Sequence, residues 1–338
     1  MAKTIEEIAS ELSVSTTTVS LALSGKARQY RISMATEERI KAYAEEHGYQ
    51  INHTARSLRL QRTDTMALIV PRLSNHFFAS LAEKLEIRCR DAGIQLFVSC
   101  CYDNPDTQLQ LIQNFRQRNI DGLFVVPSNP QIPEKANRFF KHRMVLLDRD
   151  FGLRDFPVII TDNKNASISL TEKILANNAK AAGETEILFL AGNPDMPSIK
   201  ARISGFETAL KGKKIPEKNI RIVTVPRNGF NEGTEGMQAA LAAKKAIPDI
   251  LLTSSIPVFE GALHALKQQI GEVPATMMLA TFDDHTMLDF LPNPVCSAKQ
   301  DSDHMIRAAY DEMEKLIKNI HAPQTHIASL KIIARNMV

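Results

Sequence analysis

The stretch Thr4-Ile-Glu-Glu-Ile-Ala-Ser-Glu-Leu12, followed by Ser13-Val-Ser15 and Thr16-Thr-Thr-Val-Ser-Leu-Ala-Leu23, decides the fold of the N-terminal part of the chain. Thr4 and Glu7 have the spacing of a capping box, which predicts that a helix begins there. Apolar residues then recur at helical spacing, and Ser15 can cap a second helix. Two short helices joined by a tight turn, the second opening with small polar residues, indicate a helix-turn-helix.

A helix-turn-helix places the start of its second helix in the DNA major groove, whereas an ordinary helical hairpin has no such function. We expect Val19 and Leu23 on the buried side of the second helix. The residues expected to face outward are Thr16, Thr17, Ser20 and Leu21. A third helix is predicted over 34–46, ending at His47-Gly48, which completes a small domain over residues 1–50.

Two clusters of basic residues flank this region without neighbouring acids. They are Lys26, Arg28 and Arg31 after the second helix, and Arg56, Arg59 and Arg62 before the first expected strand. Both clusters suit contacts with DNA phosphates, although a solvated basic loop explains either one equally well. A short polar helix over 52–60 is expected within a hinge and linker spanning 51–63, and a helix of that length needs a partner to become stable.

From Thr65 onward, short apolar runs of strand length alternate with helical stretches. Strands are expected at 66–71, 94–100, 122–127, 144–148 and 158–161, and then at 187–192, 220–225, 250–253 and 277–282. Helices are expected at 77–92, 107–118, 133–142, 200–210, 231–245 and 258–269. Strand–helix alternation predicts an α/β fold with parallel sheets covered on both faces.

Two consecutive series of this kind predict two doubly wound lobes over residues 64–338. The segments 296–298, 303–320 and 327–333 are expected to return and complete them. Ligands of such folds lie beyond the carboxyl ends of the strands, here in the cleft between the lobes.

The composition fits a globular protein, and 338 residues are enough for two or three cores. The N-terminus has no signal-peptide core and no apolar run approaches the length of a membrane span, which predicts a cytoplasmic protein with no membrane partner. The cysteines, Cys89, Cys100, Cys101 and Cys296, form neither a C-x-x-C pair nor a zinc-type spacing. We therefore expect reduced thiols, no metal site and no cofactor.

Neither an enzyme nor a periplasmic sugar-binding protein fits the whole sequence. The chain lacks G-x-G-x-x-G after a strand, a P-loop and G-x-S-x-G. Asp283-Asp284 is a carboxylate pair, but adjacent residues at a strand end point apart. A periplasmic binding protein would have the two lobes without a helix-turn-helix. The sequence therefore predicts a DNA-binding protein that is not an enzyme.

A helix-turn-helix, a hinge and a two-lobed periplasmic-binding-protein-like domain, in this order, resemble the LacI/GalR family of bacterial repressors. The resemblance covers the whole chain. It is carried by Thr4-Ile-Glu-Glu-Ile-Ala, Val14-Ser15, Thr18-Val19-Ser20, Ala55-Arg-Ser-Leu58, Asp121-Gly122-Leu123, Asp162-Asn163, Arg202-Ile-Ser-Gly-Phe206 and Thr281-Phe-Asp-Asp284.

The loop Gly25-Lys-Ala-Arg-Gln-Tyr-Arg-Ile-Ser33 is similar to that of the fructose-type branch of the family. Leu21, Ile160-Thr-Asp162 and Phe282-Asp-Asp-His285 resemble the sucrose operon repressors of that branch. The loop itself and Leu288-Asp-Phe-Leu291 also resemble its catabolite repressor/activators. Two residues depart from the family: Ser13 stands where glycine is usual, and Leu21 replaces a basic or aromatic residue.

The resemblance implies operator DNA as a partner, read by a twofold homodimer that either stays a dimer or pairs into a tetramer. The implied DNA-binding residues are Thr4, Ser15, Thr16, Thr17, Thr18, Ser20, Leu21, Arg28, Arg31, Ala55 and Leu58. Within this set, Thr16 and Thr17 would touch base edges and Ser15 a phosphate, while Leu58 of the hinge would enter the minor groove.

The resemblance also implies a sugar effector between the lobes. Arg202 and Asp283 would clamp its hydroxyls, unless they form a structural salt bridge. The other implied effector residues are Arg149, Asp162, Phe230, Ser255 and Gln300. Arg149 would suit a phosphorylated sugar, but pairing with Asp148 or Asp150 is the alternative. The implied function is repression of sucrose utilisation, relieved by fructose or a fructose phosphate; the alternative is a catabolite repressor/activator that responds to a phosphorylated fructose.

Overall fold

The computed structural model describes residues 3–49, 62–140, 143–243 and 247–337. Contacts divide the chain into two compact units, Met1–Thr63 and Asp64–Val338. We call them the head unit and the two-lobed unit, and each is described by itself. No helix within the described ranges is both long and apolar enough to cross a membrane.

The described part of the head unit is helical. It contains α1 (Ile5–Glu11), α2 (Thr16–Leu23), the 3-10 helix η1 (Ala27–Tyr30) and α3 (Met34–Glu46). The predicted capping box is confirmed, because Thr4 Oγ1 accepts from the amide of Glu7 at 3.3 Å and Glu7 Oε2 accepts from the amide of Thr4 at 2.7 Å. The helices pack around Ile8, Ala9, Val19, Ala22, Ile40 and Ala44. Leu23, expected on the buried side, is only partly buried.

The turn between α1 and α2 has the geometry of a helix-turn-helix. Ser13 adopts a left-handed backbone with φ of 53°. Glycine reaches this region without a steric penalty and other residues rarely do, which explains why glycine is usual here in the family that the sequence resembles. Ser15 Oγ then accepts from the amide of Thr18 at 3.1 Å and starts α2, as predicted.

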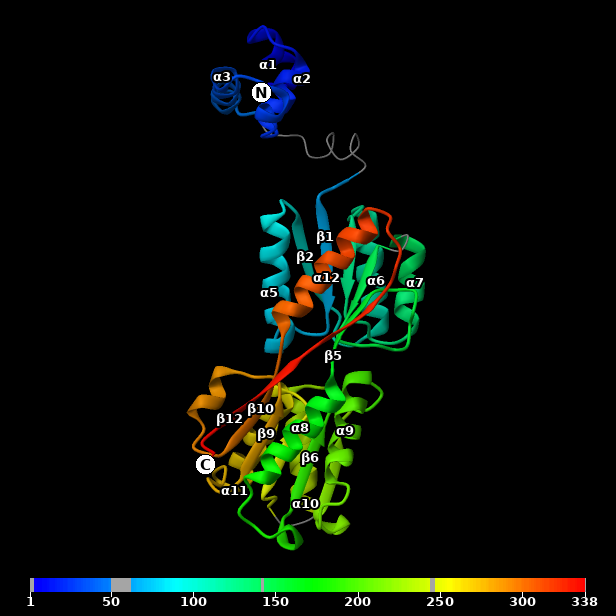
Figure 1. Cartoon of the computed structure of the whole chain (residues 1–338), viewed down its shortest axis with the longest axis vertical. Helices are drawn as coiled ribbons and strands as arrows, with labels where there is room; N and C mark the ends of the chain where they lie inside the picture. The colour runs from blue at the N-terminus through cyan, green and yellow to red at the C-terminus, as the bar shows by residue number, and fades with distance from the viewer. Residues whose placement is uncertain (1–2, 50–61, 141–142, 244–246, 338) are drawn as a thin grey trace. The chain divides into compact units, whose positions relative to one another are not determined.

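The first lobe is built on an all-parallel sheet with the order β11-β5-β4-β3-β1-β2 (Figure 1). Its strands are β1 (Thr65–Val70), β2 (Gln95–Cys100), β3 (Gly122–Val125), β4 (Met144–Leu147), β5 (Val158–Thr161) and β11 (Thr325–Ala328). Helices α5 (His76–Asp91) and α12 (Ser302–Ile317) cover one face, and α6 (Pro105–Gln117) and α7 (Gln131–Phe140) cover the other. The central strands are therefore buried on both faces, which explains why they read as continuous apolar runs.

The second lobe repeats this plan with the order β12-β10-β9-β8-β6-β7, in which only β12 is antiparallel. Its strands are β6 (Ile187–Ala191), β7 (Ile220–Thr224), β8 (Ile250–Thr253), β9 (Met278–Phe282), β10 (Val295–Gln300) and β12 (Leu330–Arg335). Helices α8 (Asn163–Ala176) and α9 (Pro197–Leu210) cover one face, and α10 (Phe230–Ala243) and α11 (Ile256–Ile270) cover the other. Short 3-10 helices lie at η2 (Ala182–Glu184), η3 (Glu217–Asn219) and η4 (Thr286–Phe290).

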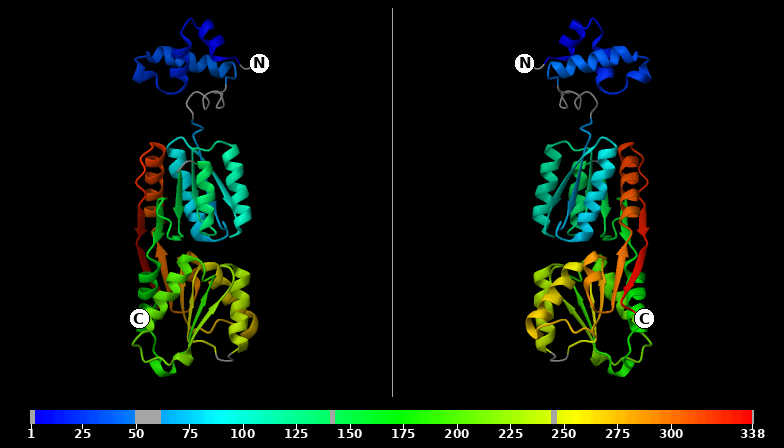
Figure 2. Two further views of the ribbon diagram at one scale, coloured as in Figure 1. Left: turned by 90° about the vertical axis from the view of Figure 1, so that its right-hand side faces the viewer. Right: turned by 90° about the vertical axis from the view of Figure 1, so that its left-hand side faces the viewer.

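The chain crosses between the lobes at Asp162, Asp301 and Ser329, and Figure 2 shows the C-terminal strands β11 and β12 running beside both lobes. The crossings are hydrogen-bonded to one another, from the amide of Asp162 to the carbonyl of Ala328 at 3.4 Å and from the amide of Asp301 to the carbonyl of Ser329 at 3.3 Å. Each aspartate also caps the helix that follows it, α8 or α12.

Two elements differ from the sequence-based expectation. Helix α8 was not expected, because its buried face includes Asn163, Ser167 and Thr171 and so lacks a clear apolar stripe. The expected segment 327–333 is divided at Ser329 into β11 and β12, which belong to different sheets.

Candidate functional site

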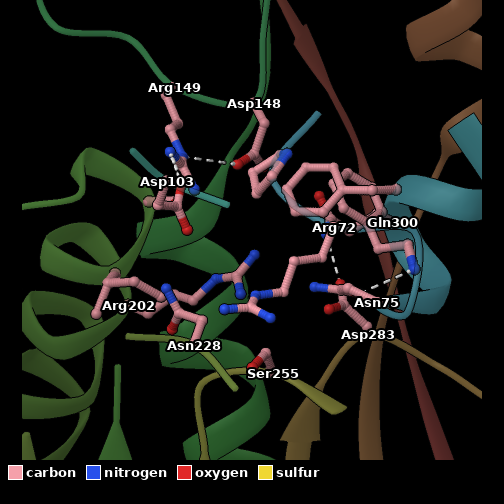
Figure 3. Close-up of a pocket in the computed structure, with 15 residues that line it drawn as sticks. Arg72, Asn75, Asp103, Asp148, Arg149, Arg202, Asn228, Ser255, Asp283 and Gln300 are labelled. Atoms are coloured by element: carbon pink, nitrogen blue, oxygen red, sulfur yellow. Dashed lines mark hydrogen bonds and ion pairs between the residues drawn. The ribbon is translucent and has the colours of Figure 1, made fainter. Parts of the chain in front are cut away.

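A cavity lies between the two lobes, beyond the carboxyl ends of their strands (Figure 3). It holds about 500 Å³ of empty space, its open mouth included. The lining residues are Pro71, Arg72, Asn75, Phe77, Phe78, Asp103, Asp148, Arg149, Ser198, Ile199, Arg202, Asn228, Ser255, Asp283 and Gln300. Three arginines and three aspartates are thus gathered in one interlobe space.

Arg202 and Asp283 are both buried in the second lobe and face this cavity. Arg202, on α9, donates from Nε to Asn163 Oδ1 at 2.8 Å and from Nη1 to the carbonyl of Ser254 at 2.5 Å. Its guanidinium also lies 4.2 Å from the centroid of the Phe282 ring. Burial lowers the pKa of Arg202, while the nearby Asp283 and Asp148 oppose that shift.

Asp283 follows β9 and is fixed by Gln300. Its Oδ1 accepts from Gln300 Nε2 at 2.6 Å, and Gln300 Oε1 in turn accepts from Thr161 Oγ1 at 2.6 Å. Burial raises the pKa of the Asp283 carboxyl, and Arg202 and Gln300 oppose the shift. The site therefore presents an acceptor and a donor whose positions are both set by neighbours, as a polyhydroxyl ligand requires.

The structure shows which acid Arg149 pairs with. Its Nη1 lies 2.6 Å from Asp103 Oδ1 and donates to the carbonyl of Pro127 at 3.1 Å. Asp148 Oδ2 is farther away, 3.8 Å from Nε, and Asp150 instead pairs with Arg154. The main partner of Arg149 is thus Asp103, which the sequence did not identify.

Three buried polar atoms of the cavity lining have no hydrogen-bond partner within the described part of the chain. They are Arg149 Nε, Asn228 Oδ1 and Ser255 Oγ. A buried polar group without a partner is costly, and such groups are usually satisfied by protein, water or ligand. A donor, an acceptor and a hydroxyl are therefore available to a polar ligand.

Two of the expected effector residues lie outside this lining. Asp162 sits at a lobe crossing, where its carboxylate caps α8 by accepting from the amide of Asn165 at 3.2 Å. Phe230 begins α10, is 42% exposed, and places its ring centroid 5.2 Å from that of His264. The structure brings together the other five: Arg149, Arg202, Ser255, Asp283 and Gln300.

The comparisons with known proteins bear on both units. Residues 4–52 match the lacI family of bacterial regulatory proteins, and residues 66–320 match a periplasmic binding protein domain. A sucrose operon repressor from Klebsiella pneumoniae is 32% identical over 318 residues, which cover 93% of this chain and 92% of the relative. The chain belongs to the LacI family of bacterial regulatory proteins.

Two further relatives refine this LacI-family assignment. A catabolite repressor/activator from Salmonella typhimurium is 29% identical, covering 98% of this chain and 97% of its own. The crystal structure of the Cra transcriptional dual regulator from Pseudomonas putida, in complex with fructose 1-phosphate, has a TM-score of 0.72 and 27% identity, covering 80% of this chain and 98% of that one. These relatives are transcription regulators and not enzymes, so this LacI-family chain is a sugar-responsive transcriptional repressor.

Several cavity residues of this LacI-family protein were missed in the sequence. Arg72, Asn75, Asp103 and Asn228 all follow strands at their carboxyl ends, which is the signal that could have found them. Asn228 also depends on Gly192, because a Cβ at residue 192 would lie 1.6 Å from Asn228 Oδ1. Glycine at that position leaves the room that the amide needs.

In the head unit, the residues implied in DNA reading lie at the start of α2 and in the loop after it. Ser15, Thr16 and Thr17 are exposed, whereas Thr18, Ser20 and Leu21 are partly buried. Thr4, Arg28 and Arg31 are exposed as well. Ala55 and Leu58 lie outside the described residues.

Proposed function

We propose that this chain represses genes of sucrose utilisation and is released from its operator by fructose or a fructose phosphate bound between the lobes. The sequence features of the fructose-type branch and the 32% identity to a sucrose operon repressor support this assignment. The observation that carries it is the interlobe cavity, with Arg202 and Asp283 facing it and three buried polar atoms left for a ligand.

Each cavity group has a role suited to a sugar. Arg202 donates to adjacent hydroxyls, and Asp283, fixed by Gln300 at 2.6 Å, accepts from them. Ser255 Oγ can donate or accept, since its hydroxyl is buried without a partner among the described residues. Asp162 and Phe230 are not needed as direct contacts, because one caps a helix and the other is exposed outside the lining.

The head unit supplies the operator contacts in this proposal. Exposed Thr16 and Thr17 meet base edges in the major groove, and Ser15 with the nearby amides holds a phosphate. Arg28 and Arg31 add phosphate contacts from the following loop. A twofold homodimer with Leu58 of each hinge at the central base step would then read a pseudo-palindrome.

Release follows from linkage between the two sites. If the sugar prefers one arrangement of the lobes and operator DNA prefers the other, each ligand lowers the affinity for the other by the same factor. The hypothesis needs no contact between sugar and DNA.

A catabolite-type regulator that responds to a phosphorylated fructose is the second candidate. Arg72, Arg149 and Arg202 all line the cavity beside three aspartates, and guanidinium groups are suited to binding a phosphate. The Pseudomonas putida relative was crystallised with fructose 1-phosphate. Arg149 separates the two candidates. For free fructose it remains the partner of Asp103. For a phosphorylated sugar, its Nε, which makes no hydrogen bond among the described residues, turns to the phosphate.

The test is operator binding of the purified protein, titrated with fructose, fructose 1-phosphate, fructose 6-phosphate and sucrose. The operator is first selected from random-sequence duplexes, and the salt concentration is held fixed because phosphate contacts make affinity salt-dependent. We expect release by fructose or a fructose phosphate in wild type. Asp283→Asn should lose at least about tenfold in sensitivity to the sugar, since it removes a charge-assisted acceptor.

The matched control is Asp195→Asn, which changes an exposed carboxylate outside the cavity lining and should respond like wild type. Release by free fructose supports the sucrose repressor, and release only by a phosphorylated sugar supports the catabolite-type regulator. Tighter operator binding with sugar, or no effect of any of the four, would contradict both.

A further inference from the structure

The effector clamp Asp283 has an unusual backbone. Its φ is 68°, in the left-handed region that residues other than glycine rarely occupy. Such a conformation persists when the surroundings hold it in place. Its amide donates to the carbonyl of Ala298 at 3.1 Å, and its carboxylate is directed toward Gln300 and the cavity.

The next residue, Asp284, does not line this cavity, but together with Asp283 and Gln300 it lines a neighbouring pocket. Its Oδ1 accepts from Ser297 Oγ at 2.7 Å and from Arg335 Nη2 at 2.8 Å. Lys299 Nζ lies 3.9 Å from the other carboxylate oxygen. The two consecutive aspartates therefore have different partners: Gln300 holds Asp283, whereas Ser297 and Arg335 hold Asp284.

Arg335 is the centre of that cluster and comes from a distant part of the chain. It ends β12 and pairs in register with Val295 of β10. Besides Asp284, its guanidinium donates to Ser297 Oγ at 3.0 Å and to Asp289 of η4. One side chain near the C-terminus thus joins the end of β9, the 3-10 helix after it and the neighbouring strand β10. Residue 335 lies beyond the stretch matched by the periplasmic binding protein domain, 66–320.

The first lobe also has a left-handed aspartate after a strand, but its surroundings differ. Asp148 follows β4, the strand at the corresponding place in the sheet order, and its φ is 65°. The residue after it is Arg149, which packs into the cavity against Asp103. An arginine from the C-terminal strand that holds the residue after the left-handed aspartate is therefore a feature of the second lobe.

We propose that Arg335 is a positioning residue of the effector site. Through Asp284 it holds the β9–η4 turn so that the left-handed Asp283 presents its carboxylate to the sugar. The C-terminal strand β12 then contributes to effector affinity without touching the ligand. The inference rests on the proposed function, since it takes Asp283 as the sugar clamp.

The experiment compares Arg335→Gln and Asp284→Asn with wild type in the full-length protein. Calorimetric titration with the fructose sugar that releases wild type gives the effector Kd, and operator binding without sugar gives the DNA Kd. Because a hydrogen bond to a charged group is lost, we expect the effector Kd to rise by about tenfold or more in each variant. The DNA Kd without sugar should change by less than about twofold, because the head unit is unaltered.

The double variant should be no worse than Arg335→Gln alone, since the interaction that Asp284→Asn removes is already lost in that variant. Arg335→Lys should retain more effector affinity than Arg335→Gln. The lysine ammonium keeps the positive charge but lacks the planar guanidinium that donates to three partners. Lys180→Gln is the matched control: it removes an ion pair of the same lobe, 2.6 Å from Asp249, that does not contact the 283–290 turn.

An effector Kd within about twofold of wild type in a folded Arg335→Gln protein overturns the inference. If that variant does not fold, Asp284→Asn decides in the same way. A wild-type protein that binds none of the sugars contradicts the proposed function instead, so the two failures are distinguishable.

Discussion

At the scale of single residues, Asp103 and Asp148 lie on two sides of the Arg149 guanidinium but in different environments. Asp103 Oδ1 is 2.6 Å from Nη1 and its side chain is 23% exposed, whereas Asp148 is buried and 3.8 Å from Nε. Burial raises the pKa of the Asp148 carboxyl above its ordinary value of 3.8, and Arg149 and Arg202 only partly oppose the shift. The two carboxylates should therefore contribute to stability with opposite signs.

The pH dependence follows from the raised pKa of Asp148. The folded protein binds this proton more tightly than the unfolded chain does, so the stabilising contribution is present below pH 3.8 and is lost as the pH rises through the folded-state pKa. At neutral pH, well above the ordinary pKa of 3.8, that stabilising contribution is absent and burying this carboxyl is unfavourable.

We expect Asp148→Asn to raise the free energy of unfolding of the ligand-free protein at pH 7 and to flatten its decrease with rising pH in the acidic range. Asparagine also tolerates a left-handed backbone, so the φ of 65° costs little. Asp103→Asn removes the close partner of Arg149 and should lower the stability by about 2 kcal/mol. Urea unfolding of the three proteins at several pH values measures both effects, and a loss of stability in Asp148→Asn at pH 7 would show that the pairing with arginine outweighs burial.

At the scale of elements, the head unit contains two helices with the same cap. Ser15 Oγ accepts from the amide of Thr18 at 3.1 Å, and Ser33 Oγ accepts from the amide of Thr36 at 3.2 Å. In each case the serine hydroxyl is also 2.8 Å from the threonine hydroxyl. Helix α2 carries the residues proposed to read DNA, while α3 packs behind it in the core.

Ser15→Ala and Ser33→Ala should therefore cost the head unit a similar stability, about 1 kcal/mol each. Only Ser15→Ala should weaken operator binding severalfold more than Ser33→Ala does. In that variant the start of α2, which is proposed to contact the DNA, loses its phosphate contact. Fluorescence anisotropy with labelled operator, beside thermal unfolding of the same proteins, separates the two effects. Equal losses of operator affinity in both variants would remove Ser15 from the DNA contacts.

Much of the element arrangement could be predicted from the sequence, for a physical reason. A strand buried on both faces must be apolar throughout, so β5 and β8 are found at the predicted bounds, 158–161 and 250–253. Helix α8 was not predicted because its buried face contains polar residues. Ser167 is one of them, and its burial is possible because its hydroxyl donates to the carbonyl of Arg202 at 2.6 Å. The pairing of Arg149 with Asp103 depends on which loops the strand order brings together. Local sequence periodicity does not predict such a long-range contact.

At the scale of the whole molecule, the head unit and the two-lobed unit have separate hydrophobic cores. The two-lobed unit has its own apolar clusters on both faces of each sheet. Residues 64–338 should thus fold and bind sugar without the head unit. A difference in sugar affinity between this fragment and the intact chain would come from DNA and not from the missing helices.

We expect the fragment 64–338 and the DNA-free intact chain to bind the fructose sugar with the same Kd. Saturating operator should raise the Kd of the intact chain alone, by the factor, about 5- to 150-fold, with which the sugar weakens operator binding. Calorimetry of the fragment, and of the intact chain with and without operator, checks this prediction. If operator leaves the sugar Kd unchanged while the sugar still releases operator, the two ligands are not linked through the lobes. Release would then have to arise from sugar acting at the DNA surface, and the cavity around Arg202 and Asp283 would lose its regulatory role.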